Sequence, residues 1–338
     1  MSGATFRPRA PRRLSLALRA ARRAVAYYLL VTLRALVLAV PDRLAHAVFK
    51  FIADFAFITI GIHRRRAMAH LRIAFPEMSC AEARLIAKRM TRHLARNAVE
   101  FIRLPRLPKR RLLEMVKLEG RETAEKVTAE GRGGIAMSAH LGNWEFFAAV
   151  ISAMGYGIAI IARRVYYDKF ERLLRGMRRL AGVRVIHRDK PKDMLRALRA
   201  GRFLGVMLDM DIEKVESVYV EFFGRLALTP VGPVALALRM GLPLVPAFIV
   251  RNEHGGHAKG PEHTLFIEPP LHLIRTGDMQ KDLLVNTMRA AKVVERMIRR
   301  YPDQWMWMHR RWQHQPEWPF VKTSSHAKTP SPQRSSEE

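Results

Sequence analysis

Residues 134–145 read GIAMSAHLGNWE, a short apolar run followed by a glycine-containing turn and the start of a second apolar stretch. The run Ile135–Ser138 predicts a buried strand. The stretch Asn143–Met154 predicts a helix. A strand, a turn and a helix in direct succession are typical of α/β proteins.

The same alternation continues to about residue 300. Further strands are predicted at Gly157–Ala162, Val183–Ile186, Phe203–Leu208, Val218–Phe222 and Leu244–Val250. Further helices are predicted at Lys169–Leu180, Lys192–Ala200, Gly232–Met240 and Lys281–Arg300. The pattern indicates an α/β fold, with a mixed, largely parallel sheet flanked by helices.

Composition divides the chain into three parts. The parts are a basic arm with an apolar helix (1–41), one large domain (42–321) and a Ser-, Pro- and Lys-rich tail that we expect to be disordered (322–338). The large domain comprises a helical entry region (42–120) and the α/β core (121–321). Helices are expected in the entry region at Leu44–Ile62 and Ala81–Leu104, the second capped by Ser79.

The chain is strongly basic. Its 59 Lys and Arg residues against 30 Asp and Glu residues give a formal net charge of +29. A charge of this size favours an anionic partner, such as a nucleic acid, an anionic membrane surface, an acidic protein or a phosphorylated substrate. The single cysteine, Cys80, excludes an intramolecular disulfide and a cysteine-cluster zinc site.

The N-terminal region favours a membrane surface as one such partner. Seven arginines and no acidic residue precede the run Ala24–Val40, which is apolar and aromatic except for Thr32 and Arg34. A membrane-spanning helix needs about 20 apolar residues, and a central arginine is costly there. We therefore expect a basic amphipathic helix that lies in the membrane interface on the cytoplasmic side, with an ordinary buried helix as the alternative.

A candidate catalytic pair follows the strand at 135–138. His140 lies at the carboxyl end of this strand, where open α/β sheets bind ligands, and Glu145 comes five positions later in the first turn of the helix. The spacing lets Glu145 reach the imidazole. Such a pair suits acyl transfer, because His140 can take a proton from an attacking hydroxyl while Glu145 fixes its tautomer. The helix N-terminal amides of Gly142 and Asn143 are placed to face a developing oxyanion.

The alternative for this pair is a helix-capping histidine beside an acid that favours the helix dipole. Ordered blocks along the chain decide between the two. They are RAMAHL at 66–71, AFPEMS at 74–79, HLGNWE at 140–145, ARR at 162–164, IHRD at 186–189, LDMD at 208–211, FFG at 222–224 and YPDQWMWMHRRW at 301–312. Together they resemble the lipid A lauroyl/myristoyl acyltransferase family of the lysophospholipid-acyltransferase superfamily. The chain departs from the family pattern at His70, where Asn is usual, and at Arg164, where Pro is usual.

The resemblance implies roles for further residues. Arg163 is the substrate-site arginine, with Arg164 as the alternative, and Asp209 helps to organise the donor or acceptor pocket. Thr229 lies in a segment, TPVGP, that can open a helix and offer backbone amides to a phosphate or an oxyanion, or it serves only as the helix cap. No metal site and no cofactor are expected.

The resemblance also implies the reaction and its partners. The donor is a fatty acyl thioester, most often on acyl carrier protein, and the acceptor is a hydroxyl of an anionic glycolipid such as a lipid A precursor. Both partners are anionic, which suits the net charge of +29. The expected location is the cytoplasmic face of the inner membrane.

Two other readings of the chain remain alongside this one. One is a lysophospholipid or phosphatidylinositol-mannoside acyltransferase that uses acyl-CoA, and the other is a catalytically silent lipid-binding relative. A nucleic acid is not an expected partner, because the chain shows neither a reading helix nor an aromatic-studded basic surface.

Overall fold

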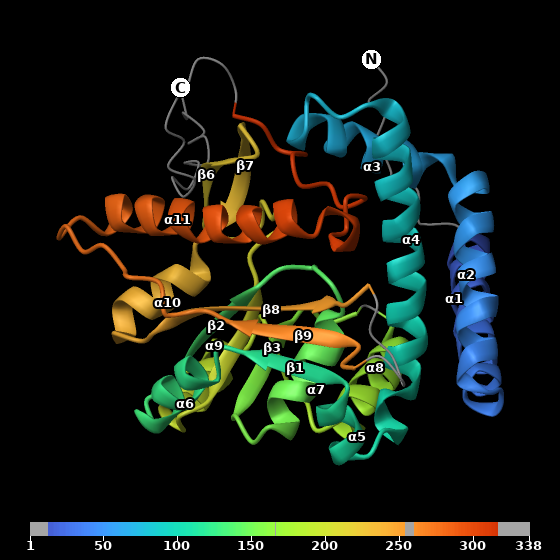
Figure 1. Ribbon diagram of the computed structural model, residues 1–338, viewed down its shortest axis with the longest axis horizontal. Coiled ribbons are helices and arrows are strands. Elements are labelled where there is room, and N and C mark those ends of the chain that lie inside the picture. The colour runs from blue at the N-terminus through green and yellow to red at the C-terminus, as the bar shows by residue number, and fades with distance from the viewer. Residues whose placement is uncertain (1–12, 166, 254–259, 317–338) are drawn as a thin grey trace, which may run out of the picture.

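The computed structural model describes residues 13–165, 167–253 and 260–316 (Figure 1). The strands are β1 (Val116–Glu119), β2 (Gly134–Ser138), β3 (Ile158–Ala162), β4 (Arg184–His187), β5 (Phe203–Met207), β6 (Ser217–Phe222), β7 (Arg225–Pro230), β8 (Leu244–Arg251) and β9 (His263–Ile267). The helices are α1 (Arg13–Ala39), α2 (Asp42–Thr59), α3 (Gly61–Ala74), α4 (Cys80–Arg103), α5 (Lys109–Glu114), α6 (Arg121–Ala129), α7 (Trp144–Ala153), α8 (Asp168–Leu180), α9 (Pro191–Arg199), α10 (Gly232–Met240) and α11 (Met279–Arg300). Two short 3₁₀ turns lie at Leu104–Arg106 and Pro302–Gln304.

The main sheet has seven strands in the order β1-β9-β8-β2-β5-β3-β4. Its strands pair in parallel except β8 and β9, and β6 and β7 form a separate antiparallel hairpin. The predicted fold class, a mixed and largely parallel sheet flanked by helices, is confirmed. In this order β2 is central and β5 is its neighbour, although three helices and two strands separate them along the chain.

Helices pack against both faces of the sheet. In Figure 1, α10 and α11 lie on one side of the strands, and α6 and α7 lie on the other. The first side encloses a core that contains the buried tryptophans Trp305 and Trp307, and the second encloses a core around Phe146 and Phe147 on α7. Both faces of the sheet are covered, and β2 is accordingly buried along its whole length.

The helical entry region stands beside the sheet and is organised by α4. This helix begins with a capping box, in which the Ser79 side chain accepts from the Glu82 amide and Glu82 accepts from the Ser79 amide. The predicted cap is therefore confirmed. Contacts with α1, α2 and α3 on one side and with α7 on the other make α4 the link between the entry region and the core.

The prediction of one helix at 44–62 is wrong at its end, because α2 ends at Thr59 and a new helix, α3, begins at Gly61. The side chain of Arg64 donates to the carbonyl oxygens of Phe57 and Ile58, both at 3.0 Å, and so supplies partners for the last turn of α2. The strands β1, β7 and β9 were not predicted. β1 is four residues long with two charged residues, and that composition gives little strand signal.

Large apolar side chains are exposed on the first two helices. They are Leu18, Val25, Tyr28, Leu29 and Leu36 on α1, and Leu44, Val48, Phe51, Ile52, Phe55 and Ile58 on α2. Within the described ranges no single helix meets the length and hydropathy expected of a membrane span; α2 and α3 meet it only as a pair bent by 83°. The membrane-associating role of residues 1–41 stays a prediction, and the tail at 322–338 lies outside the described residues.

Candidate active site

His140 lies two residues beyond β2, in a turn that the chain can make only because of Gly142. Gly142 has φ = +59°, and a Cβ there would lie 1.9 Å from the carbonyl oxygen of Ile249 on β8. The turn also contacts the C-terminal segment, because Leu141 forms an antiparallel bridge with Trp305. The position of His140 is therefore fixed by close backbone packing on two sides.

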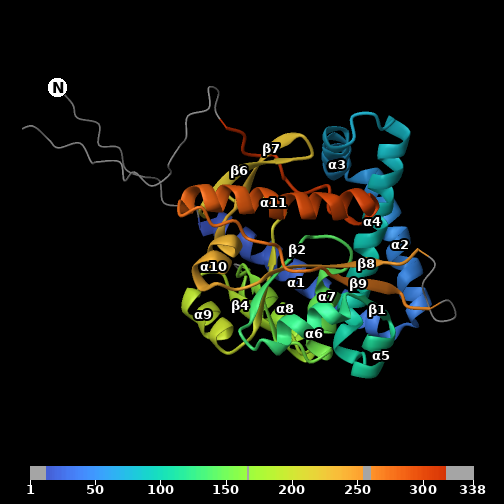
Figure 2. The same ribbon diagram turned by 60° about the vertical axis from the view of Figure 1, so that its left-hand side comes forward.

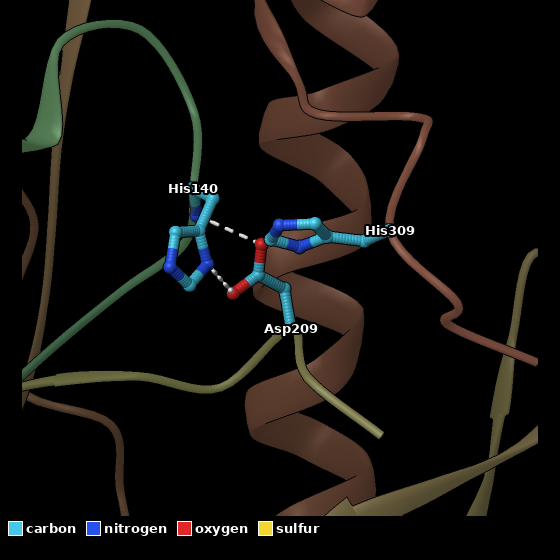
Figure 3. Close-up of side chains that lie close together, drawn as sticks. All are labelled: His140, Asp209 and His309. Carbon is cyan, nitrogen blue, oxygen red and sulfur yellow. Dashed lines mark hydrogen bonds and ion pairs between the residues drawn. The ribbon is translucent and has the colours of Figure 1, made fainter. Parts of the chain in front are cut away.

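Asp209 is the carboxylate that binds His140. The Asp209 Oδ1 lies 2.9 Å from His140 Nδ1, and its Oδ2 accepts from the His140 amide at 2.8 Å (Figure 3). Oδ2 also accepts from the indole Nε1 of Trp305 at 2.8 Å. The register explains the meeting: Ser138 pairs with Met207 in the neighbouring strand, so the residues two positions further on in each strand lie side by side.

The contact between Asp209 and His140 shifts the pKa values of both side chains. Burial alone would raise the pKa of Asp209, but attraction by His140 and the hydrogen bonds it accepts hold the pKa of this carboxyl well below its ordinary range. Burial lowers the pKa of His140, yet Asp209 and, to a lesser extent, Glu145 raise it above its ordinary value of 6.5. An ionised Asp209 can only accept hydrogen bonds, so Nδ1 of His140 carries the proton and Nε2 is the basic nitrogen.

A second imidazole, that of His309, lies beside the first. The ring centroids of His140 and His309 are 4.9 Å apart, and Figure 3 shows His309 next to the Asp209 carboxylate. Burial, supported by repulsion from His140 and His70, lowers the pKa of His309 to about 4 even though Asp209 attracts the charged form. His309 is therefore neutral at physiological pH and can donate one N–H to a reacting group.

The predicted contact between Glu145 and His140 is wrong. The Glu145 carboxylate accepts instead from Nε and Nη2 of Arg178 on α8, at 2.9 and 2.5 Å. A bidentate pair of this kind holds the carboxylate in one orientation. The charge of Glu145 contributes, less than that of Asp209, to the raised pKa of the His140 imidazole.

Gly142 and Asn143 serve to anchor the turn. The Gly142 amide donates to the carbonyl of Gln304 at 3.0 Å, so the prediction that it faces an oxyanion is wrong. The Asn143 Oδ1 caps α7 by accepting from the amide of Phe146, and its Nδ2 donates to Glu100 at 2.6 Å. The side chain of Asn143 is thus occupied on both sides.

Glu100 on α4 is the centre of a buried network below the turn. Its carboxylate lies 2.6 Å from Nη2 of Arg251 and 3.4 Å from Nε2 of His263. Burial raises the pKa of Glu100, but these two neighbours hold it well below the ordinary range. Asn97, one helical turn earlier on α4, donates to the Gly142 carbonyl at 2.6 Å. The entry region therefore helps to hold the turn that contains His140 in place.

The predicted arginines lie at the same edge of the sheet as His140 but further out. Arg163 and Arg164 follow β3, and both are exposed. The guanidinium of Arg164 donates to Asp168 at 2.9 Å in the first turn of α8. The substrate-binding role of both arginines stays a prediction.

Thr229 lies in β7, and the segment TPVGP does open a helix, since α10 begins at Gly232; the alternative role of Thr229 as the helix cap is wrong, and its substrate-binding role stays a prediction. Its hydroxyl accepts from Nη2 of Arg311 at 2.7 Å, and the residue that precedes α10 is Val231. Arg311 is 1% exposed and also donates to the carbonyl of Leu228. Burial lowers the pKa of Arg311 to about 10, so it is a buried cation at physiological pH.

The spacing of donor atoms would also permit a metal ion here. The candidate ligand atoms of His140, Asp209 and His309 all lie within 4.8 Å of one another. Both oxygens of Asp209 are already occupied, however, by His140 and by Trp305. A metal would have to displace the bond between Nδ1 and Oδ1, so the arrangement suits a hydrogen-bonded base better than a metal centre.

Comparison with known proteins bears on what this site does. The chain matches the model of the bacterial lipid A biosynthesis acyltransferase family over residues 13–314. It is 28% identical over 261 residues to a lipid A biosynthesis lauroyltransferase of Escherichia coli (strain K12), and the match covers 75% of this chain and 81% of the relative. The identity is 23% over 263 residues, with the same coverage, to a lipid A biosynthesis palmitoleoyltransferase of that organism.

A relative with another printed acceptor also matches. The chain is 27% identical over 218 residues to a phosphatidylinositol mannoside acyltransferase of Mycolicibacterium smegmatis (strain ATCC 700084 / mc(2)155), covering 62% of this chain and 70% of the relative. The family match spans the site from the catalytic turn to His309, and it confirms the resemblance stated from the sequence. This chain belongs to the bacterial lipid A biosynthesis acyltransferase family and is an acyltransferase.

Proposed function

We propose that the enzyme moves a fatty acyl chain from an acyl thioester to a hydroxyl of a phosphorylated glycolipid of the lipid A type, with His140 as general base and Asp209 as its positioning residue. The observation that carries the proposal is the pair of contacts between Asp209 and His140, at 2.8 and 2.9 Å. They fix both the backbone and the ring of the histidine. In Figure 3 the second ring nitrogen lies on the side of the ring away from Asp209.

Because Nδ1 of His140 carries a proton, Nε2 is the nitrogen that can accept one from the substrate. Nε2 of His140 takes the proton of the acceptor hydroxyl while its oxygen attacks the thioester carbonyl carbon. The tetrahedral intermediate then breaks the carbon–sulfur bond, and the leaving thiolate receives the proton from Nε2. The buried, ionised Asp209 stabilises the imidazolium between the two steps. Atoms and charge balance without an acyl-enzyme.

His309 is placed to assist the intermediate. Its neutral ring lies next to that of His140, and its Nδ1 is buried without a hydrogen-bond partner among the described residues. A neutral imidazole N–H can stabilise a developing oxyanion without adding a proton to it. His309 therefore supplies the hydrogen bond that was expected from the Gly142 amide.

The proposed setting is the cytoplasmic face of the inner membrane, with acyl carrier protein as donor. The exposed apolar side chains of α1 and α2 support membrane contact, since exposed apolar patches of this extent commonly mark an interaction surface. Arg163 and Arg164 follow β3 and are exposed, and in this proposal they bind acceptor phosphates. The net charge of +29 suits both an acidic donor protein and a phosphorylated acceptor.

The relative named a phosphatidylinositol mannoside acyltransferase indicates a second class of acceptor, which is to be compared with the lipid A type. Its acceptor, by that name, is a mannosylated phosphatidylinositol. Both acceptors are glycolipids that present a sugar hydroxyl near phosphate, so the His140 chemistry is the same for each. The acceptor that is acylated faster at equal concentration identifies the class.

The test compares membranes that contain wild type, His140→Ala or His272→Ala. Each is given acyl carrier protein with a long acyl chain and a tetra-acylated, phosphorylated glucosamine disaccharide lipid, and products are read by mass spectrometry. A parallel set receives the same donor with a mannosylated phosphatidylinositol, and both sets are repeated with acyl-CoA. We expect a mass gain of one acyl group that persists in His272→Ala, whose side chain is exposed, and falls by about 10²–10⁴-fold in His140→Ala. No transfer by wild type to either acceptor would refute the proposal.

A further inference from the structure

His309 lies in a segment without helix or strand, although the proposed function needs its ring in a defined place. Residues 306–313 form turns and bends after the 3₁₀ turn at Pro302–Gln304. One turn ends at His309, whose amide donates to the carbonyl of Met306 at 3.0 Å. A donor to a reacting group must be held by its surroundings to within a fraction of an ångström. The side chains that hold this segment are therefore candidates for positioning residues.

Two side chains of α3 bind the carbonyl groups of the two residues before His309. Nη1 of Arg66 donates to the carbonyl of Met308 at 3.3 Å, and Nδ1 of His70 lies 2.8 Å from the carbonyl oxygen of Trp307. Arg66 and His70 are four positions apart, so they project from the same face of the helix. Figures 1 and 2 show the segment after α11 running beside α3. We call Arg66 and His70 the α3 clamp.

The protonation state of His70 follows from its partner. A carbonyl oxygen only accepts, so Nδ1 of His70 carries a proton and donates it to Trp307. Burial lowers the pKa of His70 below its ordinary value of 6.5, although the bond to Trp307 raises it, and Arg66 and Arg225 lower it further. At physiological pH the ring is therefore neutral, with its one N–H in the bond to the segment that carries His309.

The α3 clamp is rigid because the helix and the ring are both packed. The His70 ring lies edge-to-face on Trp312, with the ring centroids 4.9 Å apart. Trp312 is buried in the same core cluster as Ala67 and Leu71 of α3, both of which are 0% exposed. Close packing of this kind leaves a side chain few alternative rotamers. The carbonyl of Trp307 is thus held by a donor that cannot easily move away.

His70 is not placed to stabilise the reaction intermediate itself. It lies close enough to His309 for its charge to lower the pKa of that residue. Its proton, however, is donated to the Trp307 carbonyl, and a neutral imidazole has no second N–H to offer an oxyanion. What His70 can contribute is the position of the segment from which His309 projects.

We propose that His70 is a positioning residue for His309: its bond to the Trp307 carbonyl, supported by the bond from Arg66 to the Met308 carbonyl, sets the direction in which His309 presents its N–H to the tetrahedral intermediate. The inference rests on the proposed function, because it concerns the proposed oxyanion donor of that reaction. Loss of the clamp weakens an interaction made only in the transition state, so it lowers kcat and leaves KM for the acceptor nearly unchanged.

Two substitutions at His70 separate the hydrogen bond from the packing. His70→Phe keeps a ring against Trp312 but has no N–H for the Trp307 carbonyl. His70→Asn is the rescue variant, because its Nδ2 is as many bonds from Cα as Nδ1 of histidine and can donate to the same oxygen. Arg66→Ala removes the other bond of the α3 clamp and leaves the contact between His70 and Trp312 intact, so it tests the clamp without a change of ring.

The control removes a bond of the same kind elsewhere. Nη2 of Arg275 donates to the carbonyl of Leu238 on α10 at 2.8 Å, and Figure 1 shows α10 near the opposite end of α11 from α3. Arg275→Ala therefore loses a side-chain bond to a carbonyl without touching the segment of His309. Each substitution is made in wild type and in His309→Ala, and kcat and KM are measured with the donor and acceptor of the proposed reaction. Urea denaturation in detergent checks that each variant is folded.

We expect His70→Phe to lower kcat by about tenfold or more, and Arg66→Ala by about threefold, with KM for the acceptor within about twofold of wild type. His70→Asn should recover most of the rate, and Arg275→Ala should match wild type. In the His309→Ala background, His70→Phe and Arg66→Ala should have almost no further effect, because the group that they position is gone.

The double variants decide whether His70 acts through His309. If His70→Phe is folded and lowers kcat by the same factor with and without His309, the positioning role is overturned and the proposed function is untouched. The same holds if His70→Phe raises KM for the acceptor and leaves kcat unchanged, or if His70→Asn is as slow as His70→Phe. A wild-type kcat in His309→Ala alone would refute the oxyanion role of His309 in the proposed function, and the positioning role of His70 with it.

Discussion

The two loops that meet at the active site are held in different ways. The loop after β2, which contains His140, is held by α4 through Asn97 and Glu100 and also by the C-terminal segment through Gln304 and Trp305. The loop after β5, residues 208–211, is held by the C-terminal segment. Asp209 accepts a hydrogen bond from Trp305. The Asp211 carboxylate accepts from the backbone amide of His314 at 3.0 Å and lies 2.5 Å from Nδ1 of its ring.

This difference assigns separate tasks to the two loops. The first loop presents His140, the proposed base, and the entry region that helps to position it also carries the exposed apolar surface of α1 and α2. The second loop supplies the carboxylate, and the segment that holds it also supplies His309. The active site is therefore assembled from three distant parts of the chain, and changes in each part are expected to fail in distinct ways.

The largest effect is expected from the support of the first loop. Glu100→Ala leaves Arg251 as a buried charge without its carboxylate, so the free energy of unfolding should fall by roughly 3–5 kcal/mol. Glu114→Ala is the control, because the Glu114 pair with Arg110 is exposed and its loss should cost about 1 kcal/mol or less. Urea denaturation in detergent measures both. Equal losses would show that the α4 network does not hold the loop.

The next effect is expected from the second loop and its C-terminal segment. His309→Ala removes the proposed oxyanion donor and should lower kcat by about 10²-fold, with little change in unfolding. His309→Gln keeps an N–H donor and should recover part of the rate. If His309→Gln is as slow as His309→Ala while both bind acceptor normally, the hydrogen-bond role of His309 is refuted.

The smallest effect concerns pH. His140 must be neutral to act as a base, so kcat/KM should rise with pH through the pKa of His140, which lies above 6.5 because Asp209 and Glu145 attract the charged form. Glu145→Gln removes the weaker attraction, which lowers this pKa and moves the acid limb of the profile to lower pH. A limb that stays in place or moves to higher pH would contradict this electrostatic role for Glu145.

Much of the fold was predictable because local patterns dominate it. The helix predicted at 232–240 has the observed bounds, and the β2 strand and α7 helix lie within one residue of their predicted ranges. The sharp bend at Ile60 was not predicted, because apolar periodicity continues across it and the hydrogen bonds of Arg64 come from the following helix. The order of strands in the sheet could not be read from periodicity at all.

Strand order is also why the site was predicted only in part. His140 stands out in a motif, and Asp209 was named as a pocket residue, but their contact depends on β2 and β5 being neighbours. Glu145 lay at a suitable spacing in the sequence, yet α8 brings Arg178 to it from 33 residues away. Trp305 and His309 were seen only as parts of a closing block. The signal for the contact between His140 and Asp209 was their equal offset from the ends of β2 and β5, which is informative only once the strand pairing is known.

The most direct test of the account is the turnover of Asp209→Asn beside that of Glu145→Gln, with carrier-bound donor and saturating acceptor. The account predicts that Asp209→Asn lowers kcat by roughly 10³–10⁴-fold, as loss of the orienting carboxylate does in hydrolase triads. Glu145→Gln should stay within about tenfold of wild type, because its carboxylate binds Arg178. A larger loss in Glu145→Gln than in Asp209→Asn would contradict the assignment of Asp209 as the partner of His140.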